Sequence, residues 1–148
     1  MAVTIYLPDG FKYLAASMLS TVVLTVVQGS VSMYYRKAAK ILYPRVYAEK
    51  AEMDANPAAY KFNCAQRVHQ NTLENIPAVL TVTALTAVTN PKFAAAGLAT
   101  FTFGRILYSW GYIATGERYA RGGVVGTLAQ LSLLGGSIYT VFKLMTAA

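Results

Sequence analysis

The chain has 148 residues, of which 55% are hydrophobic and only 13% are charged, and its mean hydropathy is +0.41. A soluble domain carries about a quarter charged residues, so this composition argues against an ordinary soluble domain and indicates a single membrane domain over residues 1–148. The formal net charge of +7 invites a nucleic-acid interpretation. The basic residues, however, flank apolar segments, where they normally orient a membrane protein and contact lipid headgroups, so no nucleic-acid partner is expected.

Four segments are long and apolar enough to cross a bilayer. A hydrocarbon core about 30 Å thick needs about 20 mostly apolar residues in a helix, and the backbone there must satisfy its own hydrogen bonds. The segments are roughly 12–35, 66–90, 92–115 and 121–146. We therefore predict an all-α membrane protein, built as a bundle of four transmembrane helices.

The first segment contains no charged residue between Lys12 and Arg36. The residues before it lack a basic region and a convincing cleavage site, so we expect an anchor that stays in the protein rather than a signal peptide. A polar connector follows, and its Pro44, Pro57 and mixed charges are typical of a loop with some turns.

The second and third segments are separated only by Asn90-Pro91, which predicts a tight turn and an antiparallel helical hairpin. The third segment should end between Ala114 and Gly116. Small residues recur in the third and fourth segments as AAAG, GGVVG and LLGGS. Such residues allow helices to approach closely in lipid.

The basic residues also predict an orientation. Eight of them lie in or beside the first and third loops, against three near the opposite face. The positive-inside rule then places these two loops in the cytosol and both termini across the membrane.

Two neighbouring helices each carry three polar residues on one face. They are Arg67, Asn71 and Glu74 at i, i+4 and i+7, and Arg105, Tyr108 and Tyr112 at i, i+3 and i+7. Arg105 lies about 21 Å along its helix from Pro91, where an unpaired arginine costs at least about 2.5–3.5 kcal/mol. Glu74 is the only acid within the four segments, so we predict a Glu74–Arg105 ion pair. The set either fixes helix register or forms a pocket for a small charged molecule at the cytosolic edge.

A metal site is not expected. His69 has no second histidine or cysteine at ligand spacing, and Cys64 is the only cysteine in the chain. For the same reason no internal disulfide can form. No nucleotide-binding motif is present.

Three motifs resemble the membrane-associated eicosanoid and glutathione metabolism (MAPEG) family. They are FNCAQRVHQNTLE at residues 62–74, GRILYSWGY at 104–112 and YYRKAAKILYP at 34–44. The resemblance implies a homotrimer that binds glutathione as a co-substrate between adjacent subunits near the cytosolic side. It also implies a location in the endoplasmic reticulum or, alternatively, in the mitochondrial outer membrane.

The resemblance further implies roles for individual residues. Arg121, at the start of the fourth helix, would face the glutathione sulfur as the catalytic residue, with Arg118 as the alternative. Arg36 would hold a carboxylate, and Glu74 would serve either the glutathione ammonium or Arg105. The full set of expected glutathione-binding residues is Arg36, Arg67, His69, Asn71, Glu74, Arg105, Tyr108 and Tyr112.

The activity implied is that of a glutathione transferase and peroxidase acting on lipophilic electrophiles and lipid hydroperoxides. Asn75 stands where some leukotriene-forming members have a tyrosine, which weakens the case for a leukotriene C4 synthase-like activity. Two alternatives remain at this point: a non-catalytic scaffold that binds lipid, and an accessory subunit of a larger membrane complex.

Overall fold

The computed structural model describes residues 8–116 and 122–147, and in these two ranges the chain forms five α-helices and no strand. The helices are α1 (Phe11–Ala39), α2 (Lys50–Ala55), α3 (Pro57–Thr89), α4 (Pro91–Thr115) and α5 (Gly123–Thr146). The prediction of an all-α protein is confirmed.

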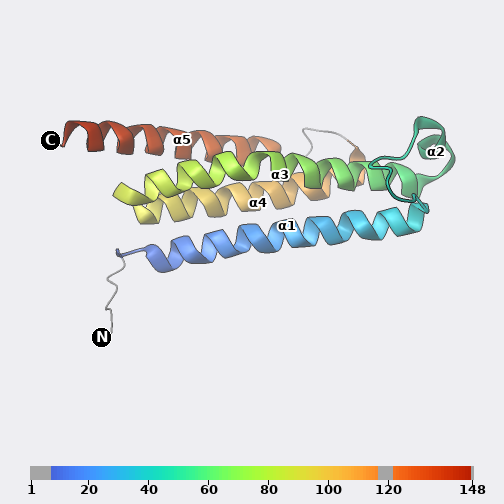
Figure 1. The fold of residues 1–148 in the computed structure, drawn as a ribbon, viewed down its shortest axis with the longest axis horizontal. Helices are drawn as coiled ribbons and strands as arrows, with labels where there is room; N and C mark the ends of the chain where they lie inside the picture. The colour runs from blue at the N-terminus through green and yellow to red at the C-terminus, as the bar shows by residue number, and fades with distance from the viewer. Residues whose placement is uncertain (1–7, 117–121, 148) are drawn as a thin grey trace.

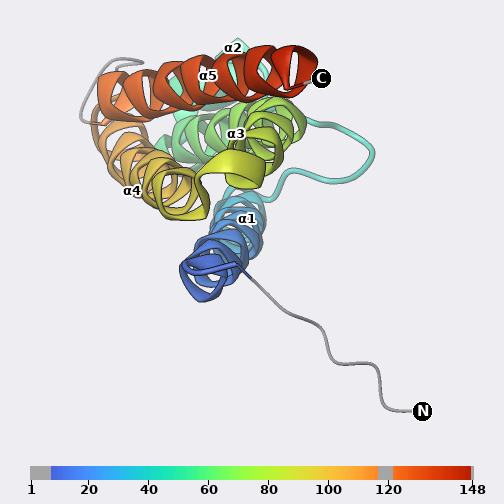
Figure 2. The ribbon, with the colours of Figure 1, turned by 90° about the vertical axis from the view of Figure 1, so that its left-hand side faces the viewer.

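The four long helices run side by side along the longest axis of the molecule (Figure 1). Helices α3 and α4 pack against each other in the middle, and both α1 and α5 contact this central pair. Seen along the bundle, α1 lies on one side of the pair and α5 on the other (Figure 2). The connector between α1 and α3, residues 40–56, lies at one end of the bundle with α2, and we call this the connector end.

Three of the long helices, α1, α3 and α5, are apolar and long enough to cross a membrane. This finding supports an integral membrane protein. The sequence predicted four such helices, whereas α4 falls short by composition. It carries Lys92 and Arg105 and is otherwise rich in alanine, glycine and aromatic residues, which are less hydrophobic than leucine, isoleucine and valine. Helix α4 nevertheless packs centrally between α1 and α5.

The second long helix begins earlier than its sequence predicts, which is close to Asn63 or Cys64, with the apolar segment starting at roughly residue 66. Helix α3 begins at Pro57, where the Asn56 side chain accepts a hydrogen bond from the Ala58 N–H at 2.9 Å. Asparagine before a helix and proline at its first position are strong start signals. The hydropathy pattern missed them because the first turns of α3 are polar. Likewise α1 continues to Ala39 rather than residue 35.

The connector contains ordered structure that its composition did not predict. The Asn63 side chain of α3 accepts from the Ala48 N–H at 2.7 Å and donates to the Ala48 carbonyl at 2.8 Å. Two nitrogens of Arg45 donate to the two carboxylate oxygens of Glu52 in α2 at 2.9 and 3.0 Å. This hydrogen bonding lowers the pKa of the Glu52 carboxyl below its ordinary value. The connector is therefore held against the bundle by specific contacts.

The predicted hairpin of two helices is confirmed. Helix α3 ends at Thr89 and α4 begins at Pro91, so a single residue, Asn90, separates them. Its side chain accepts from the Phe93 N–H at 3.1 Å and caps α4. Helix α4 ends at Thr115, within the predicted interval, and Gly116 follows with a positive φ of 77°.

Helices α4 and α5 approach so closely that glycine is required at the crossing. A Cβ atom built on Gly104 would lie 2.5 Å from the Gly126 nitrogen and 2.8 Å from its Cα. These neighbours are backbone atoms, which cannot rotate away as a side chain can. The small residues noted in the sequence thus permit the close packing that joins helices in lipid.

We expect the Gly104→Ala variant to lower the melting temperature of the purified protein in detergent. The added methyl forces α4 and α5 apart, and such overpacking costs about 1–3 kcal/mol. The matched control is Gly135→Ala in α5, where, apart from its own stretch of helix, nothing in the described parts of the chain lies within 4 Å of the added Cβ. That variant should melt at or above the wild-type temperature, since alanine favours helix over glycine. Equal melting temperatures for the two variants would contradict this account.

Candidate binding cleft between α3, α4 and α5

A cleft of about 380 Å³ opens between α3, α4 and the first turns of α5. Its volume falls within the range of small-ligand sites. Helix α3 contributes Asn71 and Asn75, and α4 contributes Arg105 and Tyr108. The α5 wall is made by residues 123–130, so the positive end of that helix dipole lies at the cleft. Three of the predicted site residues, Asn71, Arg105 and Tyr108, therefore line one cleft.

Arg105 is the central charge of this cleft and is only 8% exposed. Its Nε and Nη2 donate to the Thr72 hydroxyl oxygen at 3.1 and 2.8 Å, and Nη2 also donates to the Asn71 Oδ1 at 2.8 Å. The Thr72 hydroxyl donates in turn to the Val68 carbonyl at 3.0 Å, which fixes it as an acceptor for the guanidinium. All of these hydrogen-bond partners are neutral.

The predicted Glu74–Arg105 ion pair is wrong. Glu74 instead accepts from Arg67 on its own helix at 3.2 Å, and both side chains are more than two-fifths exposed. The reason is geometric: at about 100° per residue, Glu74 lies about 200° around α3 from Thr72, the residue that faces Arg105. In residues 8–116 and 122–147, no carboxylate forms an ion pair with Arg105.

The corrected pairing makes Glu74→Gln a mild substitution. An exposed ion pair contributes about 0–1 kcal/mol, so we expect the melting temperature to change little. The comparison variant is Thr72→Val, which has nearly the same shape but removes the buried acceptor of Arg105. Leaving a buried donor unsatisfied costs about 1–3 kcal/mol or more when it is charged, so Thr72→Val should melt clearly lower. A larger drop in melting temperature for Glu74→Gln than for Thr72→Val would contradict the exposed Arg67–Glu74 pairing and support a Glu74–Arg105 ion pair.

Two tyrosines extend from the cleft toward the connector end of α4. The Arg105 guanidinium lies 4.5 Å from the centre of the buried Tyr108 ring, a cation–π distance. The Tyr108 and Tyr112 rings stack with centroids 5.6 Å apart and an angle of 23° between their planes. The predicted face of Arg105, Tyr108 and Tyr112 on one helix is therefore present, and Tyr112 lies one turn outside the cleft lining.

Arg36 and His69 lie on a different side of the helical bundle. They line a second cavity, of about 470 Å³, between α1, α3 and connector residues 43–46. Arg36 is 8% exposed and lies between the Tyr43 and Phe62 rings at 4.5 and 4.6 Å. It donates to the Arg45 carbonyl at 2.7 Å, so in this structure it also holds the connector in place.

His69 faces α1 across this second cavity. A Cβ added to Gly29 of α1 would lie 3.5 Å from the imidazole. The His69 Nδ1 is buried and has no hydrogen-bond partner in the described parts of the chain. A buried nitrogen without a partner is unfavourable, and a polar group that binds there would satisfy it.

The two arginines expected to act on sulfur, Arg118 and Arg121, lie outside the described residues. In sequence, Arg121 directly precedes Gly122, the N-cap of α5, whose first turns line the cleft. Sequence reasoning missed Thr72, although it lies within the same polar run, because a threonine in an apolar helix usually bonds its own backbone. Among the residues described, no group of three or more His, Cys, Asp or Glu is placed to hold a metal ion.

Together these features define a helical membrane protein with a cationic cleft among its helices. The MAPEG family model matches residues 14–142, so the chain belongs to the MAPEG family. The chain is also 35% identical over 81 residues to a Synechocystis sp. protein named "Uncharacterized protein sll1147". That alignment covers 54% of this chain and 59% of the relative, so the chain spans less than two thirds of the relative's length.

Proposed function

We propose that the protein binds glutathione between adjacent copies of a homotrimer and holds its sulfur as a thiolate. In this proposal it acts as a glutathione transferase and peroxidase on lipophilic electrophiles and lipid hydroperoxides, and resembles microsomal glutathione S-transferase 3 most within its family. The membrane would be that of the endoplasmic reticulum or the mitochondrial outer membrane, with the connector on the cytosolic side. The observation that carries the proposal is Arg105, a buried cation whose hydrogen-bond partners in the cleft are neutral.

The charges on glutathione match the charges around the cleft. The tripeptide has two carboxylates, one ammonium and one thiol. Arginine donates two parallel hydrogen bonds to a carboxylate, and Arg105 supplies a buried guanidinium for an anionic group. Glu74 and Arg67 form an exposed pair on the same helix as Asn71, and an incoming ammonium and carboxylate can exchange with this pair at little cost.

Stabilising the thiolate needs only a modest energy. A free thiol has a pKa near about 8.5 and is only a few per cent ionised at neutral pH. Lowering that pKa by about two units requires about 2.7 kcal/mol of extra stabilisation for the anion. One guanidinium in a poorly solvated site can supply this, and the α5 dipole acts in the same direction. We assign the sulfur-facing role to Arg121, with Arg118 as the alternative.

The thiolate then reacts in one of two ways. It attacks a carbon of a lipid epoxide, a carbon–oxygen bond breaks, and the resulting alkoxide takes a proton from water. Alternatively it attacks the terminal oxygen of a hydroperoxide, the oxygen–oxygen bond breaks, and the lipid leaves as an alcohol once protonated. The sulfenic acid formed on glutathione condenses with a second glutathione to give the disulfide and water.

The predicted residues fall into two groups that line different cavities, which supports a site shared between copies of the chain. Asn71, Arg105 and Tyr108 line the α3–α4–α5 cleft, whereas Arg36 and His69 line the α1–α3 cavity. One ligand cannot contact both sets within a single subunit unless it crosses the packed α3 helix. A head-to-tail ring of identical subunits brings the two faces together at each interface.

A thiolate difference spectrum tests the proposal. Purified protein mixed with glutathione near neutral pH should show the ultraviolet absorption band of a thiolate, and Arg121→Ala should remove it while Arg118→Ala retains it. If Arg118→Ala alone removes the band, the sulfur-facing role belongs to Arg118. Absence of the band from the wild-type protein would reject thiolate activation and favour the non-catalytic scaffold.

A further inference from the structure

The end of α1 nearest the connector carries two exposed lysines that no acid neutralises. Lys37 lies in the last turn of α1, and Lys40 follows the helix as its C-cap. Three ion pairs form within residues 8–116 and 122–147, and neither lysine takes part in them. The acids of the connector lie in or directly before α2, which packs against α3 and not against α1. The two ammonium groups are therefore available to an anion from outside the chain.

Lys40 has a backbone conformation that normally belongs to glycine. Its φ is 58° and its ψ is 32°, and no other residue except glycine has a positive φ in the part of the chain that the structure describes. The Lys40 N–H donates to the Arg36 and Lys37 carbonyls and so closes the helix. A Cβ atom makes this left-handed conformation unfavourable, which is why glycine is common at such positions. Glycine would close α1 as well or better, so the role of the lysine side chain must lie outside the helix.

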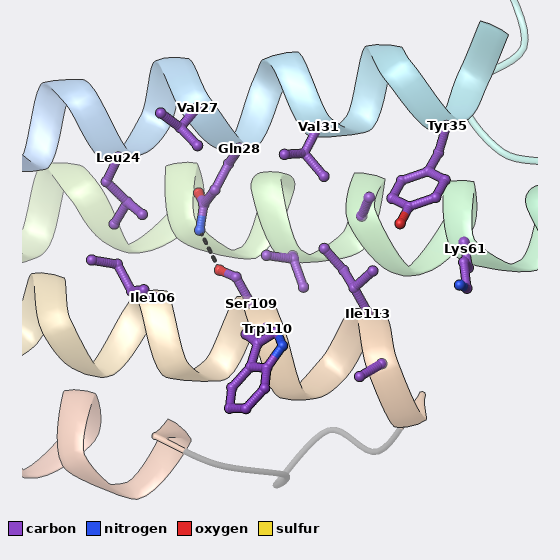
Figure 3. Close-up of a pocket in the computed structure, with 13 residues that line it drawn as sticks. Leu24, Val27, Gln28, Val31, Tyr35, Lys61, Ile106, Ser109, Trp110 and Ile113 are labelled. Atoms are coloured by element: carbon purple, nitrogen blue, oxygen red, sulfur yellow. Dashed lines mark hydrogen bonds between the residues drawn. The ribbon is translucent and has the colours of Figure 1, made fainter. Parts of the chain in front are cut away.

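Lys37 continues the face of α1 that points away from the bundle. Gln28 and Tyr35 point from α1 toward α3 and α4 (Figure 3), and Lys37 lies about 200° around the helix from Tyr35, at about 100° per residue. The outer face carries apolar and aromatic residues that are each more than half exposed: Leu19, Val23, Val26 and Tyr34. This stripe is about 22 Å long, which exceeds the half-thickness of about 15 Å that one acyl chain spans. The two lysines thus lie at the membrane-surface end of a lipid-facing stripe.

We propose that Lys37 and Lys40 bind the headgroup phosphate of an anionic phospholipid in the leaflet at the connector end, while an acyl chain lies along the outer face of α1. Lysine ammonium groups bind phosphate as compact charges, and each basic residue near an anionic membrane surface favours binding about fivefold. A zwitterionic headgroup brings its own cation close to the lysines and gains less. The proposal does not depend on glutathione binding, because neither lysine lines the α3–α4–α5 cleft or the α1–α3 cavity.

Two phospholipids with the same acyl chains test this site. We would titrate the full-length protein, in detergent micelles and without glutathione, with dioleoyl phosphatidylglycerol or with dioleoyl phosphatidylcholine. The measurement is the melting temperature, since a lipid that binds only the folded state raises it. The anionic lipid should reach its half-maximal effect at a mole fraction about tenfold to thirtyfold lower than the zwitterionic lipid. Glycerophosphoglycerol, the same anionic headgroup without acyl chains, should leave the melting temperature unchanged.

Charge-removing variants assign the contacts. Lys37→Gln and Lys40→Asn should each weaken the effect of the anionic lipid about fivefold and leave the titration with phosphatidylcholine unchanged; asparagine tolerates the left-handed conformation. Lys40→Gly should weaken the effect equally, yet without lipid it should melt no lower than the wild type. The matched control is Lys50→Gln, which removes the same charge from the first residue of α2 at the same end of the protein. It should leave both titrations unchanged.

Four results would overturn the proposal. Equal midpoints for the two lipids would show no preference for the anionic headgroup, and an equal loss in Lys50→Gln would show a diffuse positive field instead of a site. A rise in melting temperature with glycerophosphoglycerol alone would show a site for soluble phosphates. A changed oligomer mass for Lys37→Gln would assign this face to contacts between copies of the chain. The thiolate band reports separately on the glutathione proposal.

Discussion

Replacement of Arg105 by methionine is expected to weaken glutathione binding about tenfold to hundredfold while leaving the melting temperature of the ligand-free protein unchanged or higher. The two effects have opposite origins. Without ligand, Arg105 is a buried cation held by neutral oxygens of Thr72 and Asn71, and those hydrogen bonds offset the cost of removing its charge from water. Methionine has a similar length, fills the same space and carries no such cost.

When glutathione is bound, the charge of Arg105 becomes favourable, because it then pairs with an anionic group of the ligand. A hydrogen bond between charged groups contributes about 1.5–3 kcal/mol, which corresponds to about a tenfold to hundredfold loss of affinity when it is removed. The measurement is the rise in melting temperature on adding glutathione, since a ligand that binds only the folded state stabilises it. The wild type should show the rise, and Arg105→Met should not.

Two further variants give this experiment its controls. Arg105→Lys keeps the charge without the planar fork, so it should retain part of the glutathione effect. Lys92→Met removes an exposed cation at the start of α4 that pairs with Asp9, away from both cavities, and it should retain all of the effect. A large drop in the ligand-free melting temperature of Arg105→Met would show instead that Arg105 serves mainly to hold α3 and α4 together.

The helical bundle could be predicted from the sequence because its strongest signals are local. Uncharged runs, the Asn90-Pro91 turn and the stop at Gly116 each act within one or two helical turns. The predicted helix boundaries are wrong where a polar segment, which hydropathy does not mark, is nevertheless helical. Helix α3 extends from Pro57 through polar residues because Asn56 caps it, and a backbone cap is independent of whether the following turn enters lipid.

The candidate site was predictable as a set of residues but not as a set of contacts. The spacing placed Asn71 and Arg105 on helix faces that do meet. It could not place Glu74, because helical periodicity gives an angle around one helix and no information on how the neighbouring helix is rotated. Glu74 was the expected partner because it is the only acid within the four apolar segments, whereas the rotation of α4 brings Thr72 to Arg105. Similarly, the contact of Arg36 with the connector depends on a loop path that composition does not encode.

A mixed-oligomer experiment tests whether the glutathione site is shared between copies, and we expect it to restore binding that both parent variants lack. One parent carries Arg105→Met in the α3–α4–α5 cleft, and the other carries His69→Leu in the α1–α3 cavity. His69→Leu should cost little stability, because the Nδ1 it removes has no partner in the described residues. Each variant alone should lose most of its glutathione affinity, since every interface then contains one defective face.

Co-expression of the two parents with different affinity tags allows purification of oligomers that contain both. In a head-to-tail trimer of mixed composition, about one of the three interfaces joins the intact cleft of one parent to the intact cavity of the other. The mixed oligomers should therefore recover about a third of the wild-type binding stoichiometry at wild-type affinity. If the whole site lay within one copy of the chain, the two variants could not complement each other in this way. Mixed oligomers that fail to bind glutathione would therefore locate all of its contacts within one copy. Retention of full affinity by His69→Leu alone would instead exclude the α1–α3 cavity from the site.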